Sequence, residues 1–333
     1  MSNNWSERTA LVTGVGGFVG SGMALELIKR RARVVGIVRD SGGLRALAMR
    51  GLTDRIDIVQ GSINHPGLVA RAINEYEVDT VFHLAAQAIV GVAQRSPLST
   101  FESNITGTWH VLEACRTSTG VARVVVASSD KAYGDQSVLP YTEDTALEGI
   151  YPYDASKVCA DVLARSYAAA YHLPVAVVRC ANIYGPGDLN WSRLIPGTIR
   201  SALAGEDPVV RSDGTPERDY IYLEDAVDGY LRTADALPKC AGEAFNFGSA
   251  QSVSALALVK MILAATETPH LRPRVLGRAS GEIDRQCLSA DKARRLLEWK
   301  PRTTLAAGLT KSVPWYRDHL GTVRARTLQE AFA

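Results

Sequence analysis

A glycine-rich turn near the amino terminus constrains the fold more than any other feature of this sequence. Gly14, Gly17 and Gly20 follow a short β-rich run at 9–13 and open an amphipathic helical pattern at 18–31. The first glycine permits a tight turn, the second lets the backbone approach a pyrophosphate, and the third allows helix and strand to pack closely. The first N–H groups of a helix also attract an anion. This spacing predicts a dinucleotide-binding βαβ unit; the alternative is an ordinary glycine-rich turn.

The rest of the first half alternates strand and helix in the same way. Runs rich in Val, Ile and Ala predict buried strands at 9–13, 33–38, 56–60, 80–84, 123–128 and 175–181. Helical patterns lie between them, including 18–31, 66–76, 97–119 and 153–172. Strict alternation predicts an α/β fold with a Rossmann-type doubly wound parallel sheet, covered by helices on both faces.

The alternation weakens after Gly185-Pro186-Gly187. Helical patterns follow at 194–204, 224–237, 253–266 and 290–298, with short strands at 208–211 and 244–247. We therefore predict a dinucleotide-binding domain over 1–185, to which 219–240 returns. The remainder, 186–333, is predicted to form a smaller, interleaved C-terminal α/β lobe that binds substrate.

Composition excludes several classes of partner. The 333 residues include 37 basic and 35 acidic side chains, and a net charge of +2 gives no reason to expect nucleic acid or an anionic membrane. No apolar run approaches the roughly 18 residues of a membrane span, and the polar start lacks the apolar core of a signal peptide. The five cysteines form no CxxC pair and the six histidines show no metal-ligand spacing. We expect reduced thiols, no metal and a cytoplasmic location.

Three polar residues further along the chain predict redox chemistry at a hydroxyl group. Ser129 follows a predicted strand, and Tyr153 and Lys157 are four residues apart, which places them on one helical face. An ammonium beside a phenol lowers the pKa of the phenol. The resulting base can take a proton from an alcohol while a nicotinamide accepts the hydride. The alternative is a capping serine, an interfacial tyrosine and a surface lysine.

The end of the second predicted strand bears on the choice of dinucleotide. Asp40 can hydrogen-bond the ribose hydroxyls of NAD, whereas Arg39 can cover adenine or pair with the 2′-phosphate of NADP. A solvated Arg–Asp pair with no role in selectivity is the third possibility. We predict NAD, with NADP not excluded.

These motifs together resemble the extended short-chain dehydrogenase/reductase superfamily, over residues 9–315. The resemblance also rests on Arg179-x-x-Asn182-x-Tyr184-Gly185-Pro186-Gly187 and Arg218-Asp219-Tyr220-Ile221-Tyr222-x-x-Asp225. It implies an NAD(P)-dependent enzyme that acts on a nucleotide-diphospho-sugar. The cofactor-binding positions implied are Gly14, Gly17, Phe18, Val19, Arg39, Asp40, Ser62, Ile63, Leu84, Ala85, Ala86, Gln87, Asn104, Tyr153 and Lys157. Ser62 stands where relatives usually have an Asp that contacts adenine.

The triplet Ser129-Asp130-Lys131 separates subgroups within this superfamily. By resemblance, sugar 4-epimerases carry small or neutral residues after the serine, whereas 4,6-dehydratases carry an acid that protonates the departing 6-hydroxyl. The Asp-Lys form, with Glu282-Ile283-x-x-Gln286-x-Leu288-Ser289-Ala290, is similar to CDP-glucose 4,6-dehydratases. Many dehydratases have Glu in place of Lys131, so Lys131 is either the C5 base or an electrostatic stabiliser. A structural ion pair between Asp130 and Lys131 is the simpler alternative.

We predict a nucleotide-sugar 4,6-dehydratase with catalytic residues Ser129, Asp130, Lys131, Tyr153 and Lys157. A 4-epimerase or decarboxylase is the alternative enzyme, and a non-catalytic dinucleotide sensor is the alternative of another class. The substrate-binding residues implied are Gln87, Asn182, Arg193, Leu194, Arg211, Arg218 and Arg285, because arginine binds phosphate in bidentate fashion. Surface arginines in intramolecular pairs are the alternative, above all for Arg193 and Arg285. By resemblance we expect a homodimer formed through helices 97–119 and 153–172.

Overall fold

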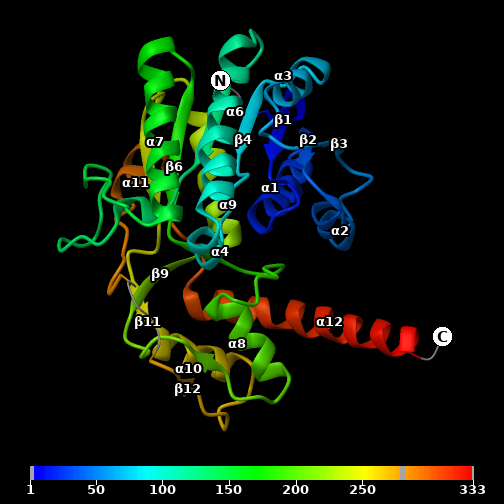
Figure 1. The fold of residues 1–333 in the computed structure, drawn as a ribbon, viewed down its shortest axis with the longest axis vertical. Coiled ribbons are helices and arrows are strands. Elements are labelled where there is room, and N and C mark those ends of the chain that lie inside the picture. Colours follow the sequence, from blue (N-terminus) through cyan, green and yellow to red (C-terminus); the bar gives the residue numbers. More distant parts are fainter. Residues whose placement is uncertain (1–3, 278–282, 332–333) are drawn as a thin grey trace.

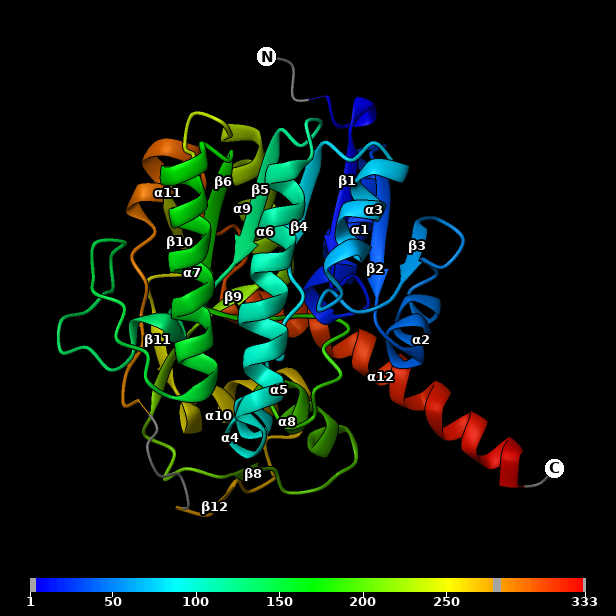
Figure 2. The same ribbon diagram turned by 45° about the horizontal axis from the view of Figure 1, so that its top comes forward.

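The computed structural model describes residues 4–277 and 283–331. Within them, seven parallel strands form a central sheet in the order β10-β6-β5-β4-β1-β2-β3 (Figures 1 and 2). The strands are β1 (Thr9–Thr13), β2 (Arg33–Val38), β3 (Asp57–Gln60), β4 (Thr80–His83), β5 (Arg123–Ala127), β6 (Val175–Cys180) and β10 (Ala244–Phe247). The predicted parallel sheet is therefore confirmed, with strand ends shifted by one residue at several positions. The strand order reverses between β1 and β4, which is where doubly wound sheets bind dinucleotides.

Helices cover both faces of this sheet because its strands are apolar on both sides. On one face lie α1 (Phe18–Lys29), α9 (Leu223–Ala236) and α11 (Asp291–Leu297); on the other lie α3 (Pro66–Glu75), α6 (Gly107–Thr117) and α7 (Pro152–Tyr171). Successive side chains of a strand point to opposite faces. Accordingly Val125 packs in the first layer, and its neighbours Val124 and Val126 pack in the second.

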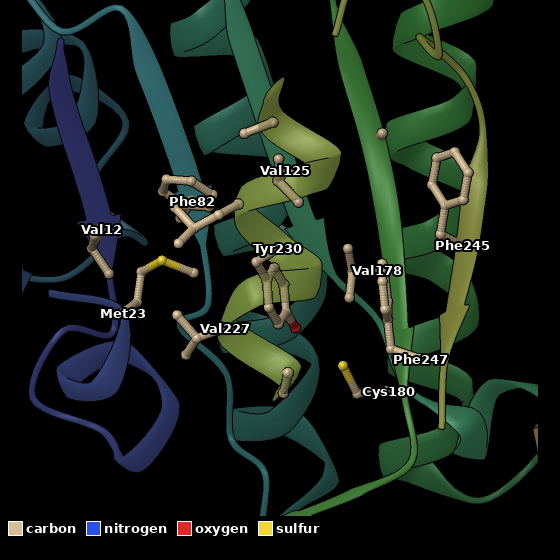
Figure 3. Close-up of a cluster of buried hydrophobic side chains, with 14 of the residues drawn as sticks. Val12, Met23, Phe82, Val125, Val178, Cys180, Val227, Tyr230, Phe245 and Phe247 are labelled. Carbon is tan, nitrogen blue, oxygen red and sulfur yellow. The ribbon is translucent and has the colours of Figure 1, made fainter. Parts of the chain in front are cut away.

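Helix α9 packs on the large sheet although it follows part of the smaller lobe in sequence. Figure 3 shows it lying over the sheet, and its Val227 and Tyr230 belong to the same buried cluster as Val125 and Val178 of the strands. Its contacts include α1, β5 and β6. Burying such aliphatic and aromatic side chains stabilises a fold by about 1.5–3 kcal/mol each, so α9 is an integral part of this layer.

The predicted helix 97–119 is interrupted. The chain forms α5 (Pro97–Phe101), a single π-helical turn over Glu102–Thr106, and then α6, preceded by the short α4 (Val90–Arg95). Single π turns inside α-helices occur frequently at functional sites. This turn contains Asn104, which is 1% exposed.

The smaller lobe lies beyond the carboxyl ends of the large sheet's strands (Figure 1). It contains the three-stranded sheet β11-β9-β7, the pair β12-β8, and helices α8 (Leu194–Leu203), α10 (Ala255–Ala265) and α12 (Leu305–Ala331). Its strands are β7 (Asn182–Tyr184), β8 (Val209–Val210), β9 (Glu217–Tyr222), β11 (Ser252–Ser254) and β12 (Arg274–Val275). The distal half of α12 extends away from the body of the molecule in both views.

Parts of this lobe differ from the sequence prediction. β9 was not predicted, because Glu217, Arg218 and Asp219 make its first half polar, and Val253, assigned to a helix, belongs to β11. The short α2 (Ser41–Met49) beside β2 and the long α12 were not predicted either. Among the described helices, none has both the length and the apolar character needed to cross a membrane.

Candidate active site

The glycine-rich turn forms an open cradle at the carboxyl end of β1. Gly14 has φ +70°, and a Cβ there would lie 2.8 Å from Cα of Ala85. The Gly17 N–H donates to the Gly14 carbonyl at 2.9 Å, which closes the turn. Gly17 is also the N-cap of α1, where no side chain caps the helix. The N–H groups of Phe18 and Val19 therefore point to the cradle without a side-chain acceptor, which is the arrangement that binds a phosphate.

A second loop, Leu84 to Gln87, is fixed beside this turn. The Thr13 hydroxyl accepts from the N–H groups of Leu84 and Ala85, both at 3.1 Å. Asn104 holds the far end, because its side chain accepts from the Gln87 N–H at 2.7 Å and donates to the Gln87 carbonyl at 3.1 Å. Ala86 lies between these anchors, so the predicted residues of this loop reach one edge of the sheet together.

His83 supports the loop from within the core. Its Nδ1 lies 2.8 Å from the Thr13 hydroxyl and its Nε2 lies 2.9 Å from the Thr108 hydroxyl. Burial lowers the pKa of His83 to about 3, so the ring is neutral at physiological pH. His83 is a hydrogen-bonded core residue.

The residues predicted to contact adenosine lie at the ends of β2 and β3. Asp40 is the N-cap of α2 and accepts from the Gly43 N–H at 3.1 Å. This bond, with the Arg39 side chain 3.0 Å away, lowers the pKa of Asp40. Both side chains are exposed. Ser62 accepts from the Asn64 N–H at 3.2 Å, and Ile63 is buried against α6 at Gly107.

The three residues predicted to act on a hydroxyl group converge from β5 and α7. Ser129 directly follows β5 and caps a short 3-10 turn, Asp130–Tyr133, by accepting from the Lys131 N–H at 3.2 Å. Tyr153 and Lys157 lie one turn apart near the start of α7. The Lys157 Nζ donates to the Ala127 carbonyl at 2.8 Å and lies 6.0 Å from the Tyr153 ring centroid.

Burial dominates the acid–base state of Tyr153. It raises the pKa of Tyr153 to about 12, and the Ser129 hydroxyl opposes this shift only in part. Burial also lowers the pKa of Lys157 to about 8. The lowering of the Tyr153 pKa by Lys157 therefore stays a prediction.

Asp130 is a buried acid beside these residues. It is 3% exposed, and burial raises the pKa of its carboxyl, although the Lys131 charge and the Ser129 hydroxyl act in the opposite direction. Ser129 Oγ donates to Asp130 Oδ1 at 3.0 Å, whereas Oδ2 has no hydrogen-bond partner among the described residues. A carboxyl in this environment favours its protonated form and so can act as an acid.

Lys131 lies between Asp130 and the smaller lobe. Its Nζ forms a short hydrogen bond to Oε1 of Gln286, which is fully buried. Asp154 is the residue after Tyr153. Burial raises the pKa of Asp154 to about 6, and the positive charge of Lys131 opposes this rise in part. Lys131 thus acts electrostatically on Asp130 and Asp154 and donates to Gln286, an arrangement larger than the simple ion pair considered from the sequence. Glu282, quoted in the same resemblance, lies outside the described residues.

The predicted arginines of the smaller lobe do not form one group. Arg193 is the N-cap residue of α8, whose first residue is Leu194. Arg193 pairs with Asp188 at 2.8 Å, and the charge of Arg193 also lowers the pKa of Tyr153. The Arg218 charge acts on Asp130. Arg285 pairs with Glu217 at 3.0 Å, and Arg211 bonds the Ser192 carbonyl. Arg193 and Arg218 are therefore near the catalytic candidates. Arg193, like Arg211 and Arg285, is also engaged in an intramolecular contact, which is the alternative predicted for Arg193 and Arg285.

Asn182, the remaining predicted substrate residue, begins β7, and its side chain donates to the Asp219 carbonyl at 3.3 Å. That bond joins the first residues of the smaller lobe to β9.

Comparison with known proteins identifies the family. A model of the NAD dependent epimerase/dehydratase family matches residues 10–248, which is most of the chain. The chain belongs to this family.

Relatives and solved structures of the family fall into both activity classes. The chain is 33% identical to a dTDP-glucose 4,6-dehydratase of Xanthomonas campestris, over 92% of this chain and 93% of that one. It is 31% identical to a UDP-glucose 4-epimerase of Mycolicibacterium smegmatis, over 92% and 98%. A dTDP-glucose 4,6-dehydratase of Streptomyces venezuelae, solved with NAD bound, is 30% identical and superposes with a TM-score of 0.86 over 94% and 98%. A UDP-glucose 4-epimerase of Thermotoga maritima, solved with UDP-glucose, is 29% identical with a TM-score of 0.87 over 94% and 99%.

The glycine cradle fits the cofactor named in the family description. A side chain at Gly14 would strike the backbone of Ala85, and the uncapped first turn of α1 provides donors for an anionic group. NAD carries such a group in its pyrophosphate. No group of three or more His, Cys, Asp or Glu side chains within 4–277 and 283–331 is placed to hold a metal ion.

Two members of the site were not predicted from the sequence as site residues. Asp154 is 4% exposed and faces the Asp130 and Lys131 charges. The sequence could have indicated Asp154 as a site residue, because it is a charged residue directly after Tyr153, in the first turn of a helix with a buried face. Gln286 belonged to the motif that carries the dehydratase resemblance, but its contact with Lys131 could not be predicted, since it joins residues 155 positions apart.

Proposed function

We propose that this chain is a nucleotide-diphospho-sugar 4,6-dehydratase. The observation that carries the proposal is Asp130, a buried carboxyl with a raised pKa that directly follows Ser129 and lies in the same site as Tyr153. Loss of a hydroxyl group from C6 requires an acid, whereas inversion at C4 does not. The dTDP-glucose 4,6-dehydratase relatives support the same activity.

The residues of the site have separate roles in this reaction. NAD, when bound, would supply the hydride chemistry between C4 and C6 of the sugar. Tyr153 takes the proton from the 4-hydroxyl, and Ser129 steadies the same oxygen by a hydrogen bond. Lys157, fixed by the Ala127 carbonyl, orients the nicotinamide ribose. Asp130 then protonates the 6-hydroxyl as it leaves.

Lys131 acts in the middle of this sequence as an electrostatic stabiliser. A ketone at C4 acidifies the hydrogen on C5, and loss of this proton to solvent places negative charge on an enolate. The positive charge of Lys131 acts on both Asp130 and Asp154, and its Nζ donates to Gln286. An ammonium held in this way stabilises a developing anion, because a preorganised donor needs no rearrangement during reaction.

The nucleotide part of the substrate extends toward the smaller lobe. Arg193 and Arg218 are the candidates for the diphosphate, because their charges reach Tyr153 and Asp130 respectively. Guanidinium groups match phosphate oxygens in geometry and charge. Gln87 and Asn182 lie at the same edge of the large sheet. The CDP-glucose resemblance remains a prediction about the nucleotide base.

A panel of nucleotide sugars tests the proposal. The NAD-loaded protein is incubated with dTDP-glucose, UDP-glucose and CDP-glucose, and each product is examined by mass spectrometry. Dehydration lowers the mass by one water, and epimerisation leaves it unchanged. Asp130→Asn should bind the same nucleotide sugar and lose water elimination. A product of unchanged mass would instead support the second candidate, a 4-epimerase, whose reaction begins with the same oxidation at C4. The 31% identical relative named UDP-glucose 4-epimerase supports this alternative.

A homodimer is also proposed. Leu98, Trp109 and Val162 are 70%, 46% and 54% exposed on the adjacent helices α5, α6 and α7. Three large apolar side chains on one helical layer favour burial against a second copy. Light scattering at micromolar concentration should give about 72 kDa, twice the chain mass of 35.9 kDa. A mass near 36 kDa would contradict this.

A further inference from the structure

Two buried polar atoms on either side of Lys131 have no hydrogen-bond partner among the described residues. They are Oδ2 of Asp130 and Nε2 of Gln286. Asp130 is 3% exposed and Gln286 is 0% exposed. Buried polar groups are nearly always paired in folded proteins, and an unpaired one costs stability. Both residues interact with Lys131, so the two unpaired atoms indicate that a ligand supplies their missing hydrogen-bond partner.

The backbone on both sides holds Gln286 in place. Its N–H donates to the Glu217 carbonyl at 3.1 Å, and its carbonyl accepts from the Asp219 N–H at 3.1 Å, so the segment extends β9. On the other side, the Tyr141 N–H donates to the Cys287 carbonyl at 2.8 Å. These bonds on both edges fix the segment, in which Arg285 is exposed and Gln286 is fully buried.

The chemistry of the two atoms defines what they bind. An amide nitrogen can only donate a hydrogen bond. The raised pKa of Asp130 favours a protonated carboxyl, whose O–H also donates. A single ligand atom that accepts from both donors needs two lone pairs. A hydroxyl oxygen that leaves as water satisfies this requirement, whereas a cation does not.

We propose that Nε2 of Gln286 donates a hydrogen bond to the 6-hydroxyl oxygen of the hexose, the oxygen that Asp130 protonates. This inference rests on the proposed dehydratase function. The C6–O6 bond breaks with its electron pair going to oxygen, which takes the proton from Asp130 and departs as water. The C5 proton has already been lost when the enolate forms, so the enolate electrons form the new C5–C6 double bond, and Asp130 remains as the carboxylate. The same amide holds Lys131 through Oε1.

The test separates action at O6 from action through Lys131. Gln286→Leu removes both amide atoms at similar volume, and Gln286→Glu keeps an acceptor for Lys131 but removes the donor. Gln251→Leu, an exposed glutamine in the loop before β11, is the matched control. Each protein is assayed for water loss from the nucleotide-glucose that the panel selects. Each is also assayed for deuterium uptake at C5 of the corresponding 6-deoxy nucleotide sugar, which has no 6-hydroxyl.

We expect both Gln286 variants to lose water about 10²-fold more slowly, the typical effect of removing one donor from a developing anion. Deuterium uptake into the 6-deoxy compound should stay within about twofold of wild type, because C5 exchange does not involve O6. An equal fall in both assays for both variants would mean that Gln286 acts only by holding Lys131, and it would overturn the proposal. Unchanged water loss would overturn it as well. If the wild-type protein dehydrates none of the nucleotide-glucose compounds, the proposed dehydratase function is wrong, and this inference fails with it.

Discussion

Replacing Asp161 by Asn should destabilise the protein by about 3–5 kcal/mol, because it leaves a buried guanidinium without a counter-charge. Asp161, on α7, and Arg179, on β6, are 0% and 1% exposed at their side chains. Two bonds of 2.7 and 3.0 Å join them, and the Arg179 Nη1 continues to the Tyr133 hydroxyl at 2.7 Å. An exposed ion pair contributes only about 0–1 kcal/mol, so burial accounts for the difference.

Urea denaturation measures this change as a lower midpoint at unchanged slope. The paired variant Asp161→Leu with Arg179→Met removes both charges, so it should lose much less stability than Asp161→Asn. Glu113→Gln, which breaks the exposed pair with Arg116, is the control and should change stability by less than about 1 kcal/mol. A loss below about 1 kcal/mol for Asp161→Asn would refute the reasoning, since the guanidinium would then be stable without its partner.

Three further predictions concern the site. Tyr153→Phe should lower turnover about 10²–10⁴-fold while NAD binding is retained, and near-native turnover would exclude Tyr153 as the proton acceptor. Lys131→Arg should keep part of the water-loss activity and Lys131→Met should keep little; equal activity in both would contradict a role for the positive charge. For Asp154, the folded-state pKa of about 6 lies above the usual value of 3.8 for an aspartate, so ionisation of its carboxyl reduces stability as the pH rises from about 4 to 6. Asp154→Asn should therefore raise the free energy of unfolding at pH 8 by up to about 3 kcal/mol, seen as a higher denaturation midpoint, and change it little at pH 4. An equal effect at both pH values would contradict this.

Local patterns were sufficient to predict the large sheet. Its strands are short apolar runs between amphipathic helices, and the turn at Gly14 has a geometry that its spacing specifies. The smaller lobe is different because its strands form through distant pairing. β9 begins with three polar residues, yet it lies between β7 and β11, which are far from it in sequence. No periodicity in a single segment indicates such pairing.

The candidate site divides in the same way. Ser129, Tyr153 and Lys157 could be found because helical spacing and a strand end place them together. The acid–base state of Tyr153 could not, because it depends on burial by segments that are not local in sequence. Gln286 reaches Lys131 only after its segment pairs with β9.

The order of the strands also affects synthesis of the chain. β10, the edge strand beside β6, is made of Ala244–Phe247, and it follows α8, β8 and β9 in the sequence. A ribosome must therefore translate much of the smaller lobe before the large sheet can close its edge. Until then the N–H and carbonyl groups along β6 are free to pair with another chain. A nascent chain stalled between β6 and β10 should accordingly be the form most prone to aggregate and the one that chaperones bind.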